Sequence, residues 1–67
     1  MLQFIMMQGL EVYDVTDRYS TAEAFVNDPR QLRTIRIFIN GVTRAEACDG
    51  VALNALVDEL TRPTRKH

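Results

Sequence analysis

Residues 35–41 read Ile-Arg-Ile-Phe-Ile-Asn-Gly, and this stretch decides the fold. Ile35, Ile37 and Ile39 recur at every second position, which is the period of a half-buried β-strand. Asn40-Gly41 predicts a two-residue hairpin turn of type I′, in which both central residues need a positive φ. We therefore expect a strand that ends at this turn and a return strand over residues 42–48.

The same plan occurs earlier in the chain. Residues 2–28 read as strand, Gln8-Gly9 turn, strand and short helix, and residues 33–62 read as strand, Asn40-Gly41 turn, strand and longer helix. Gly9 and Gly41 are thirty-two positions apart, as are Asp17 and Asp49. The repetition predicts an α+β fold of ββαββα order over residues 1–62, followed by a short basic tail over 63–67. This is a two-layer sandwich, in which a four-stranded antiparallel sheet carries both helices on one face.

Each predicted helix has a recognisable beginning and end. Ser20-Thr21-Ala22-Glu23 fits a capping box with Ser20 as the N-cap, and Asn27-Asp28-Pro29 disfavours any further helix, so residues 29–32 form a connector. Asp49 is the expected N-cap of the second helix, which Pro63 stops. Its apolar stripe is the most regular in the chain: Leu53, Leu56, Val57 and Leu60.

The predicted core depends on which face of the first hairpin is buried. A turn at Gln8-Gly9 places Met7 opposite Leu10 and Ile5 opposite Val12, and both faces of this hairpin are largely apolar. In the second hairpin the same geometry places Arg44 opposite Ile37, so either a bulge shifts the register or Arg44 reaches past the sheet edge. The expected core consists of Ile5, Leu10, Val12, Phe25, Val26, Ile35, Ile37, Ile39, Leu53, Leu56, Val57 and Leu60.

Composition excludes several classes of protein. A net charge of −1 over 67 residues gives no preference for nucleic acid or a membrane, and no secretory signal or membrane-length apolar run is present, so we expect a cytoplasmic protein. Cys48 is the only cysteine, which excludes a disulfide and the CxxC spacing of a zinc site. We expect neither a metal nor a cofactor.

No pair of residues predicts an enzyme. Cys48 precedes a helix, but its only candidate base is His67 at the end of the basic tail, so we expect a buried, unreactive thiol that packs near Ala52. Each glycine lies singly, so no loop is predicted to hold a phosphate. The size and layout are similar to those of small bacterial and phage-encoded proteins, including inhibitors that occlude a partner's surface. That likeness assigns no residue.

The remaining apolar residues predict an interaction surface. With both helices on one sheet face, the other face is expected to carry Leu2, Phe4, Met6, Tyr13, Val15 and Phe38. A patch of that size is typical of a contact surface, so we expect a homodimer, joined by sheet faces or edge strands, and a regulator or inhibitor that covers another protein. The expected contact residues are Phe4, Met6, Tyr13, Arg36 and Phe38.

A nucleic-acid-binding protein is the alternative. Arginines beside an aromatic residue on an open sheet are a common way to bind single strands, and Arg36 and Phe38 are expected to share such a face. The residues that would contact nucleic acid in this alternative are Arg33, Arg36, Arg44, Arg62, Arg65 and Lys66.

Overall fold

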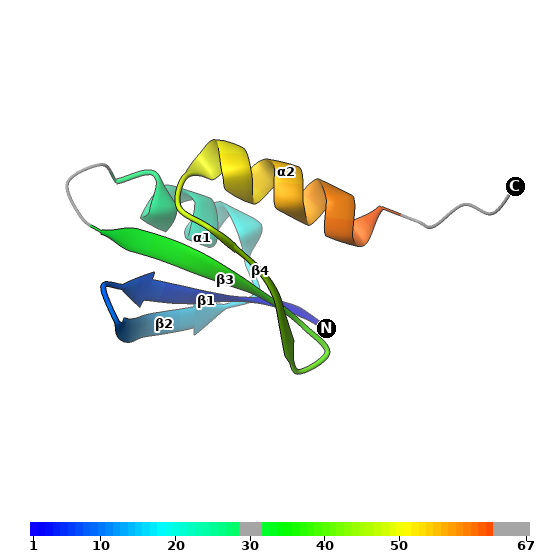
Figure 1. The fold of residues 1–67 in the computed structure, drawn as a ribbon, viewed down its shortest axis with the longest axis horizontal. Coiled ribbons are helices and arrows are strands. Elements are labelled where there is room, and N and C mark those ends of the chain that lie inside the picture. Colours follow the sequence, from blue (N-terminus) through cyan, green and yellow to red (C-terminus); the bar gives the residue numbers. More distant parts are fainter. Residues whose placement is uncertain (29–31, 63–67) are drawn as a thin grey trace, which may run out of the picture.

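The computed structural model describes residues 1–28 and 32–62, so most of the expected connector and the basic tail lie outside the described residues. The six elements follow the predicted ββαββα order (Figure 1). They are β1 (Leu2–Gln8), β2 (Glu11–Thr16), α1 (Tyr19–Val26), β3 (Arg33–Ile39), β4 (Val42–Ala47) and α2 (Gly50–Thr61).

The strands form one antiparallel sheet in the order β2-β1-β3-β4, and both helices lie on the same side of it (Figure 1). This two-layer α+β architecture is the predicted one. The β3–β4 turn is also confirmed: Asn40 has φ 51° and Gly41 has φ 85°, as a type I′ turn requires. The two hairpins are joined through the central pair of strands, β1 and β3.

The two halves of the chain are related by an offset of 31 residues, one fewer than the glycines suggest. β1 and β3 begin at residues 2 and 33, β2 and β4 at residues 11 and 42, and α1 and α2 at residues 19 and 50. Ile5 and Arg36 are equivalent under this offset, and they are paired directly between β1 and β3. A pseudo-two-fold axis therefore passes through this pair, perpendicular to the sheet.

The first hairpin turns one residue later than expected. Gln8 pairs with Glu11, so Gly9-Leu10 forms the turn, and Gly9 has φ 63°. A bulge follows in β2, because Met7 pairs with Val12 while Met6 pairs with Asp14, which leaves Tyr13 between them. The predicted opposition of Ile5 and Val12 is therefore wrong, and Ile5 faces Val15 instead.

The core is built from the other side of β1. Phe4 and Met6 pair with Ile37 and Ile35, and all four side chains are buried between the sheet and the helices. The rest of the buried cluster is Ala22, Phe25, Val26, Ala47 and Leu53, with Ile39, Leu56, Val57 and Leu60 packed against it.

Three residues that the sequence predicted for the core lie outside it. Leu10 is 98% exposed and Val12 is 60% exposed, while Ile5 lies on the sheet face away from the helices. Alternation along β1 separates its residues into two apolar sets without showing which set meets the helices. The pairing with β3 decides this, since it aligns Phe4 and Met6 with the isoleucines of β3.

The hydrogen bonds at the start of α2 include one to a side chain from the first half of the chain. Asp49 is the N-cap of α2, and its carboxylate accepts a hydrogen bond of 2.7 Å from the backbone N–H of Ala52, as predicted. Ser20 is not the N-cap of α1, because the helix begins at Tyr19, whose ring packs edge-on against Phe4. The side chain of Asn27 accepts a hydrogen bond of 2.9 Å from the N–H of Gly50. A Cβ at Gly50 would lie 2.4 Å from that Asn27 oxygen, which favours glycine there.

Candidate interaction surface

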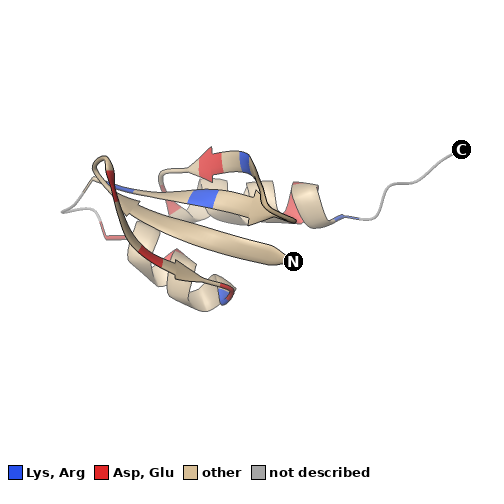
Figure 2. Ribbon diagram, turned by 90° about the horizontal axis from the view of Figure 1, so that it is seen from below, with Lys and Arg blue, Asp and Glu red and all other residues tan. Residues whose placement is uncertain are grey.

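The sheet face away from the helices carries no covering layer among the described residues. Because directly paired residues of antiparallel strands share a face, the register defines its members. We call this surface the open face: Gln3, Ile5, Met7, Val12, Val15, Thr34, Arg36, Phe38, Thr43 and Glu46. Figure 2 shows the strands in front of the helices, with β1 free of charged residues between its neighbours.

The open face is divided into an apolar half and a more polar half. The apolar half, over β2 and β1, consists of Val12, Val15, Ile5 and Met7. Val12 is 60% exposed and Val15 is 48% exposed, whereas Ile5 is half-buried and Met7 is buried. Contiguous apolar side chains that remain exposed on a soluble domain are typical of an interaction site.

In the polar half, the two charged side chains pair with each other. The Nε atom of Arg36 donates a hydrogen bond of 2.7 Å to a carboxylate oxygen of Glu46, its cross-strand partner on β4. Both side chains are exposed, so this pair adds at most about 1 kcal/mol to stability. It leaves the open face without net charge, although the sheet as a whole has acids on β2 and arginines on β3 and β4 (Figure 2).

Both edges of the sheet are interrupted by a bulge. In β2 the extra residue is Tyr13, and in β4 it is Arg44, because Ile37 pairs with Ala45 while Phe38 pairs with Thr43. The bulge is one of the two explanations that the sequence left open for Arg44. Bulges and charged residues on edge strands hinder pairing with a further strand.

The structure separates the five predicted contact residues. Phe4 and Met6 are 0% and 4% exposed and belong to the core, so their assignment to an exposed patch is corrected. Tyr13 lies at the edge, with its ring 5.1 Å from that of Phe25 on the helix side. Arg36 and Phe38 share the open face as expected. Leu2, placed in the same patch by the sequence, also packs against the core.

The arginines of the nucleic-acid alternative are not gathered on one face. Arg33 lies on the helix side, 4.4 Å from the centre of the Phe25 ring and 3.4 Å from the Asp28 carboxylate. Arg44 lies in the β4 bulge, and Arg62 forms an ion pair with Asp58 on α2. Arg65 and Lys66 lie outside the described residues.

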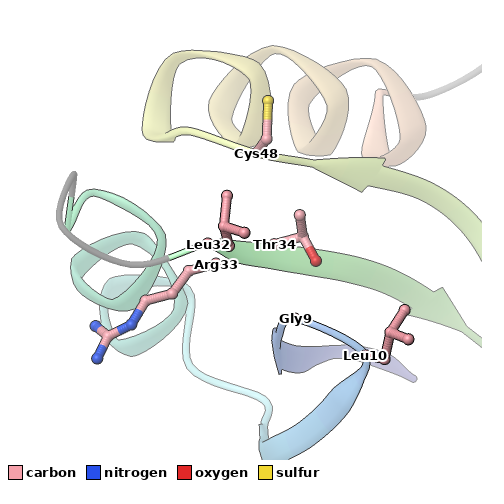
Figure 3. Close-up of a pocket in the computed structure, with 6 residues that line it drawn as sticks. All are labelled: Gly9, Leu10, Leu32, Arg33, Thr34 and Cys48. Carbon is pink, nitrogen blue, oxygen red and sulfur yellow. The ribbon is translucent and has the colours of Figure 1, made fainter.

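A pocket of about 450 Å³ lies at the end of the sheet near the β1–β2 turn (Figure 3). It is lined by Gly9, Leu10, Leu32, Arg33, Thr34 and Cys48. Leu10 and Leu32 are 98% and 85% exposed, and Thr34 belongs to the open face, so the pocket continues that surface. In Figure 3 the Arg33 side chain runs toward α1, away from the other side chains. This pocket was not predicted from the sequence, because its residues come from three separate segments.

Cys48 is exposed, which contradicts the expectation of a buried thiol. β4 ends at Ala47, whose side chain fills the core at 2% exposure. Cys48 follows after the strand has ended, and its side chain is exposed. The small residue that packs at the junction of sheet and helix is therefore Ala47.

A thiol reagent is expected to label native Cys48 without delay. The rate at neutral pH should be comparable with the rate in denaturant, because no unfolding is needed to reach an exposed sulfur. The Cys48→Ala variant should change the free energy of unfolding by no more than about 0.5 kcal/mol. Labelling that is slow until denaturant is added would contradict this placement.

The described residues contain no group of three or more His, Cys, Asp and Glu side chains that could hold a metal ion. Within the same part of the chain, no helix has the length and apolar character needed to cross a membrane. Comparisons with protein-family models, with curated proteins and with solved structures find no match for this chain. The open face is therefore the feature of the molecule from which a function can be inferred.

Proposed function

We propose that this protein is a non-catalytic protein-interaction module, of the regulator or inhibitor type, that covers a surface of its partner with the open face. The observation that carries this proposal is the apolar half of that face. Val12 and Val15 remain about half exposed or more beside Ile5, on the side of the sheet opposite α1 and α2. Burying such a surface against a partner releases water from apolar groups, which is the main favourable term in protein association.

The rest of the open face supports orientation of the partner. Protein interfaces combine an apolar centre with a polar rim, and aromatic and arginine side chains contribute a large share of the affinity. Phe38 and Arg36 lie next to the apolar half, and the Arg36–Glu46 pair offers both a donor and an acceptor to a partner. The contact residues proposed are Ile5, Val12, Val15, Arg36 and Phe38.

Nucleic acid is the second candidate, supported by the position of Arg36 and Phe38 on the same exposed face. A base could stack on Phe38 while Arg36 contacts a phosphate. For that contact, Arg36 would have to leave its partner Glu46 and bind the phosphate instead. The pairing of Arg36 and the position of Arg33 on the helix side make this candidate the weaker one.

Affinity capture from the native host tests the proposal with three proteins: wild type, Val15→Glu and Val51→Glu. Val51 is 82% exposed on α2, so the same substitution there is a matched control outside the open face. We expect a partner protein that wild type and Val51→Glu retain and Val15→Glu loses. With the partner purified, Val15→Glu should weaken binding at least about tenfold, since a charge would be buried without a counterpart.

Salt dependence separates the two candidates. Affinity that arises from an apolar interface should change little between low and moderate salt, whereas phosphate contacts lose affinity linearly in a plot of log affinity against log salt. Recovery of nucleic acid alone, with a steep salt response, would replace the first candidate by the second. Equal binding by Val15→Glu and wild type would remove the open face from the interface.

A further inference from the structure

We propose that Asn40 is a site of spontaneous covalent modification, in which its side-chain amide becomes a carboxylate through a cyclic imide formed with the backbone nitrogen of Gly41. The reactants are the chain itself and water, so the step needs neither an enzyme nor a cofactor. This inference is independent of the proposed function, because it concerns the chemistry of the β3–β4 turn. The turn that directs the second hairpin is then also its chemically labile point.

The modification consists of ring closure followed by hydrolysis. In ring closure, the Gly41 nitrogen loses its proton to hydroxide and attacks Cγ of Asn40; a C–N bond forms, and the side-chain nitrogen takes a proton from water and leaves as ammonia. Water then opens the imide at one of its carbonyl carbons. Opening at Cγ leaves an aspartate in an unchanged backbone. Opening at the backbone carbonyl carbon leaves an isoaspartate, in which the chain continues through the side chain.

The turn presents the nitrogen that attacks. Gly41 has φ 85°, and its N–H donates to no acceptor in the described part of the chain. Nothing lies within 4 Å of the position that a Cβ would take at Gly41, so the approach to this nitrogen is open. A glycine also has no side chain of its own to hinder the attack.

The side chain of Asn40 is placed for activation of the carbon that is attacked. Asn40 is exposed, and the backbone nitrogen of Met1 donates a hydrogen bond to its Oδ1 atom. Negative charge develops on this oxygen when a nitrogen attacks Cγ, and a donor already in place at the oxygen stabilises that charge. Met1 therefore assists the reaction as a donor of the oxyanion-hole type.

Asn27 and Asn54, the other asparagines of the chain, lack this arrangement. The N–H of the residue after Asn27 donates to the carbonyl oxygen of Phe25, and the Asn27 side chain itself accepts from Gly50. The residue after Asn54 lies inside α2, where its N–H is bonded within the helix. The structure thus selects Asn40 by the state of the nitrogen that follows it.

Opening of the turn sets the rate of the reaction. Ring closure rotates the peptide plane between Asn40 and Gly41, which competes with the pairing of Ile39 with Val42 beside the turn. β4 is an edge strand, so this end of the hairpin can open locally without unfolding of the whole domain. The reaction should therefore proceed in the native protein, more slowly than in the denatured chain.

The two products differ in their effect on the fold. Asp-Gly suits a type I′ turn as Asn-Gly does, so the aspartyl form should keep the hairpin. The isoaspartyl form has an additional carbon in the backbone of a two-residue turn, which should release the strand pairs closest to the turn. One of these pairs joins Phe38 of the open face to Thr43, so the isoaspartyl form should also bind a partner more weakly. This last consequence alone rests on the proposed function.

Incubation of the native chain in mildly alkaline buffer at body temperature, followed by peptide mapping with mass spectrometry, tests the site. We expect conversion of amide to acid at Asn40 to be at least about tenfold faster than at Asn27 or Asn54, because an edge turn opens at a lower free energy than a helix or its cap. The rate should rise with pH, since the attacking nitrogen must lose its proton. Asn40→Gly is the control, because Gly-Gly also suits the turn and has no amide, so this variant should stay homogeneous.

Hydrogen exchange measures the consequence for the hairpin. The isoaspartyl fraction, identified with an isoaspartate-specific methyltransferase, should exchange faster than Asn40→Asp at residues 38–43 and equally in α2. An Asn40 that stays intact in the native chain but is converted in the denatured chain would overturn the proposal, and so would earlier conversion at Asn27 or Asn54. Equal exchange in the two forms would overturn the effect on the fold. A partner that Val15→Glu loses, together with an unmodified Asn40, would retain the proposed function and exclude this inference.

Discussion

Phe4→Ala is expected to lower the free energy of unfolding by about 3–5 kcal/mol, the usual range for a phenylalanine removed from a core. Phe4 is 0% exposed, pairs with Ile37 on the neighbouring strand and contacts the ring of Tyr19 on α1. Its loss would leave a cavity between the sheet and the helices. The whole domain is expected to have a stability of only about 3–10 kcal/mol, so the variant should be largely unfolded at moderate temperature.

Phe38→Ala is the matched control, because Phe38 is the same residue type on the opposite face of the sheet. It is half-buried on the open face, on the side of the sheet opposite α1 and α2, so we expect a loss of about 1 kcal/mol. Urea denaturation followed by circular dichroism measures the free energy of unfolding of both variants. A larger loss for Phe38→Ala than for Phe4→Ala would mean that the helices cover the other face of the sheet.

Leu53→Ala is expected to cost about 2–5 kcal/mol, since Leu53 is 0% exposed and belongs to the cluster that joins α2 to the sheet. Its equivalent in the first half, 31 positions earlier, is Ala22, which is also 0% exposed. The leucine therefore fills space that the smaller residue of the first half cannot. The second helix should consequently depend on this single side chain more than the first helix depends on Ala22.

Leu10→Ala is the control for this prediction, because Leu10 is 98% exposed and should change the unfolding free energy by no more than about 0.5 kcal/mol. The same denaturation measurement compares the two substitutions. Thermal melts of both variants should agree in order with the chemical data. If both leucines prove equally important, the turn at Gly9-Leu10 would have to be packed against the rest of the molecule, contrary to the structure.

Local sequence signals were sufficient for the second hairpin and for α2. Asn40-Gly41 defines its turn through backbone geometry alone, and Asp49 defines the start of α2 through a hydrogen bond to a residue three positions later. These signals need no knowledge of distant parts of the chain. The repeated plan then predicted the element order and the fold class from the same local evidence.

Local sequence signals alone did not predict the buried face and the register of the first hairpin. Its first strand, Leu2–Gln8, is apolar on both faces, so alternation alone could not tell Phe4 from Ile5 as the core residue. Pairing with β3 resolves this choice, and that pairing joins residues more than thirty positions apart. The later turn at Gly9-Leu10 keeps Val12 on the face of Met7 and Ile5, whereas the bulge at Tyr13 moves Val15 to that face from the face of Phe4.

Prediction of the candidate interaction surface depended on the same choice, namely which face of β1 belongs to the core. Arg36 and Phe38 were placed on the open face because β3 alternates clearly, whereas Phe4 and Met6 were placed there because β1 does not. The apolar half was therefore predicted to exist and was assigned the wrong residues from β1. The pocket between Leu10, Leu32 and Cys48 depends on contacts between three segments, which no local pattern describes.

The uncharged central strand also bears on the solubility of the chain. β1 contains seven residues without a charge, and in the fold it is enclosed by β2 and β3, both of which carry charged side chains (Figure 2). Outside the fold, an apolar segment of this length with neither charge nor proline is prone to assemble into cross-β aggregates. The acids of β2 follow it directly in the chain and act as gatekeepers. Destabilised variants such as Phe4→Ala should therefore be recovered as insoluble protein in cells, more than as soluble unfolded chains.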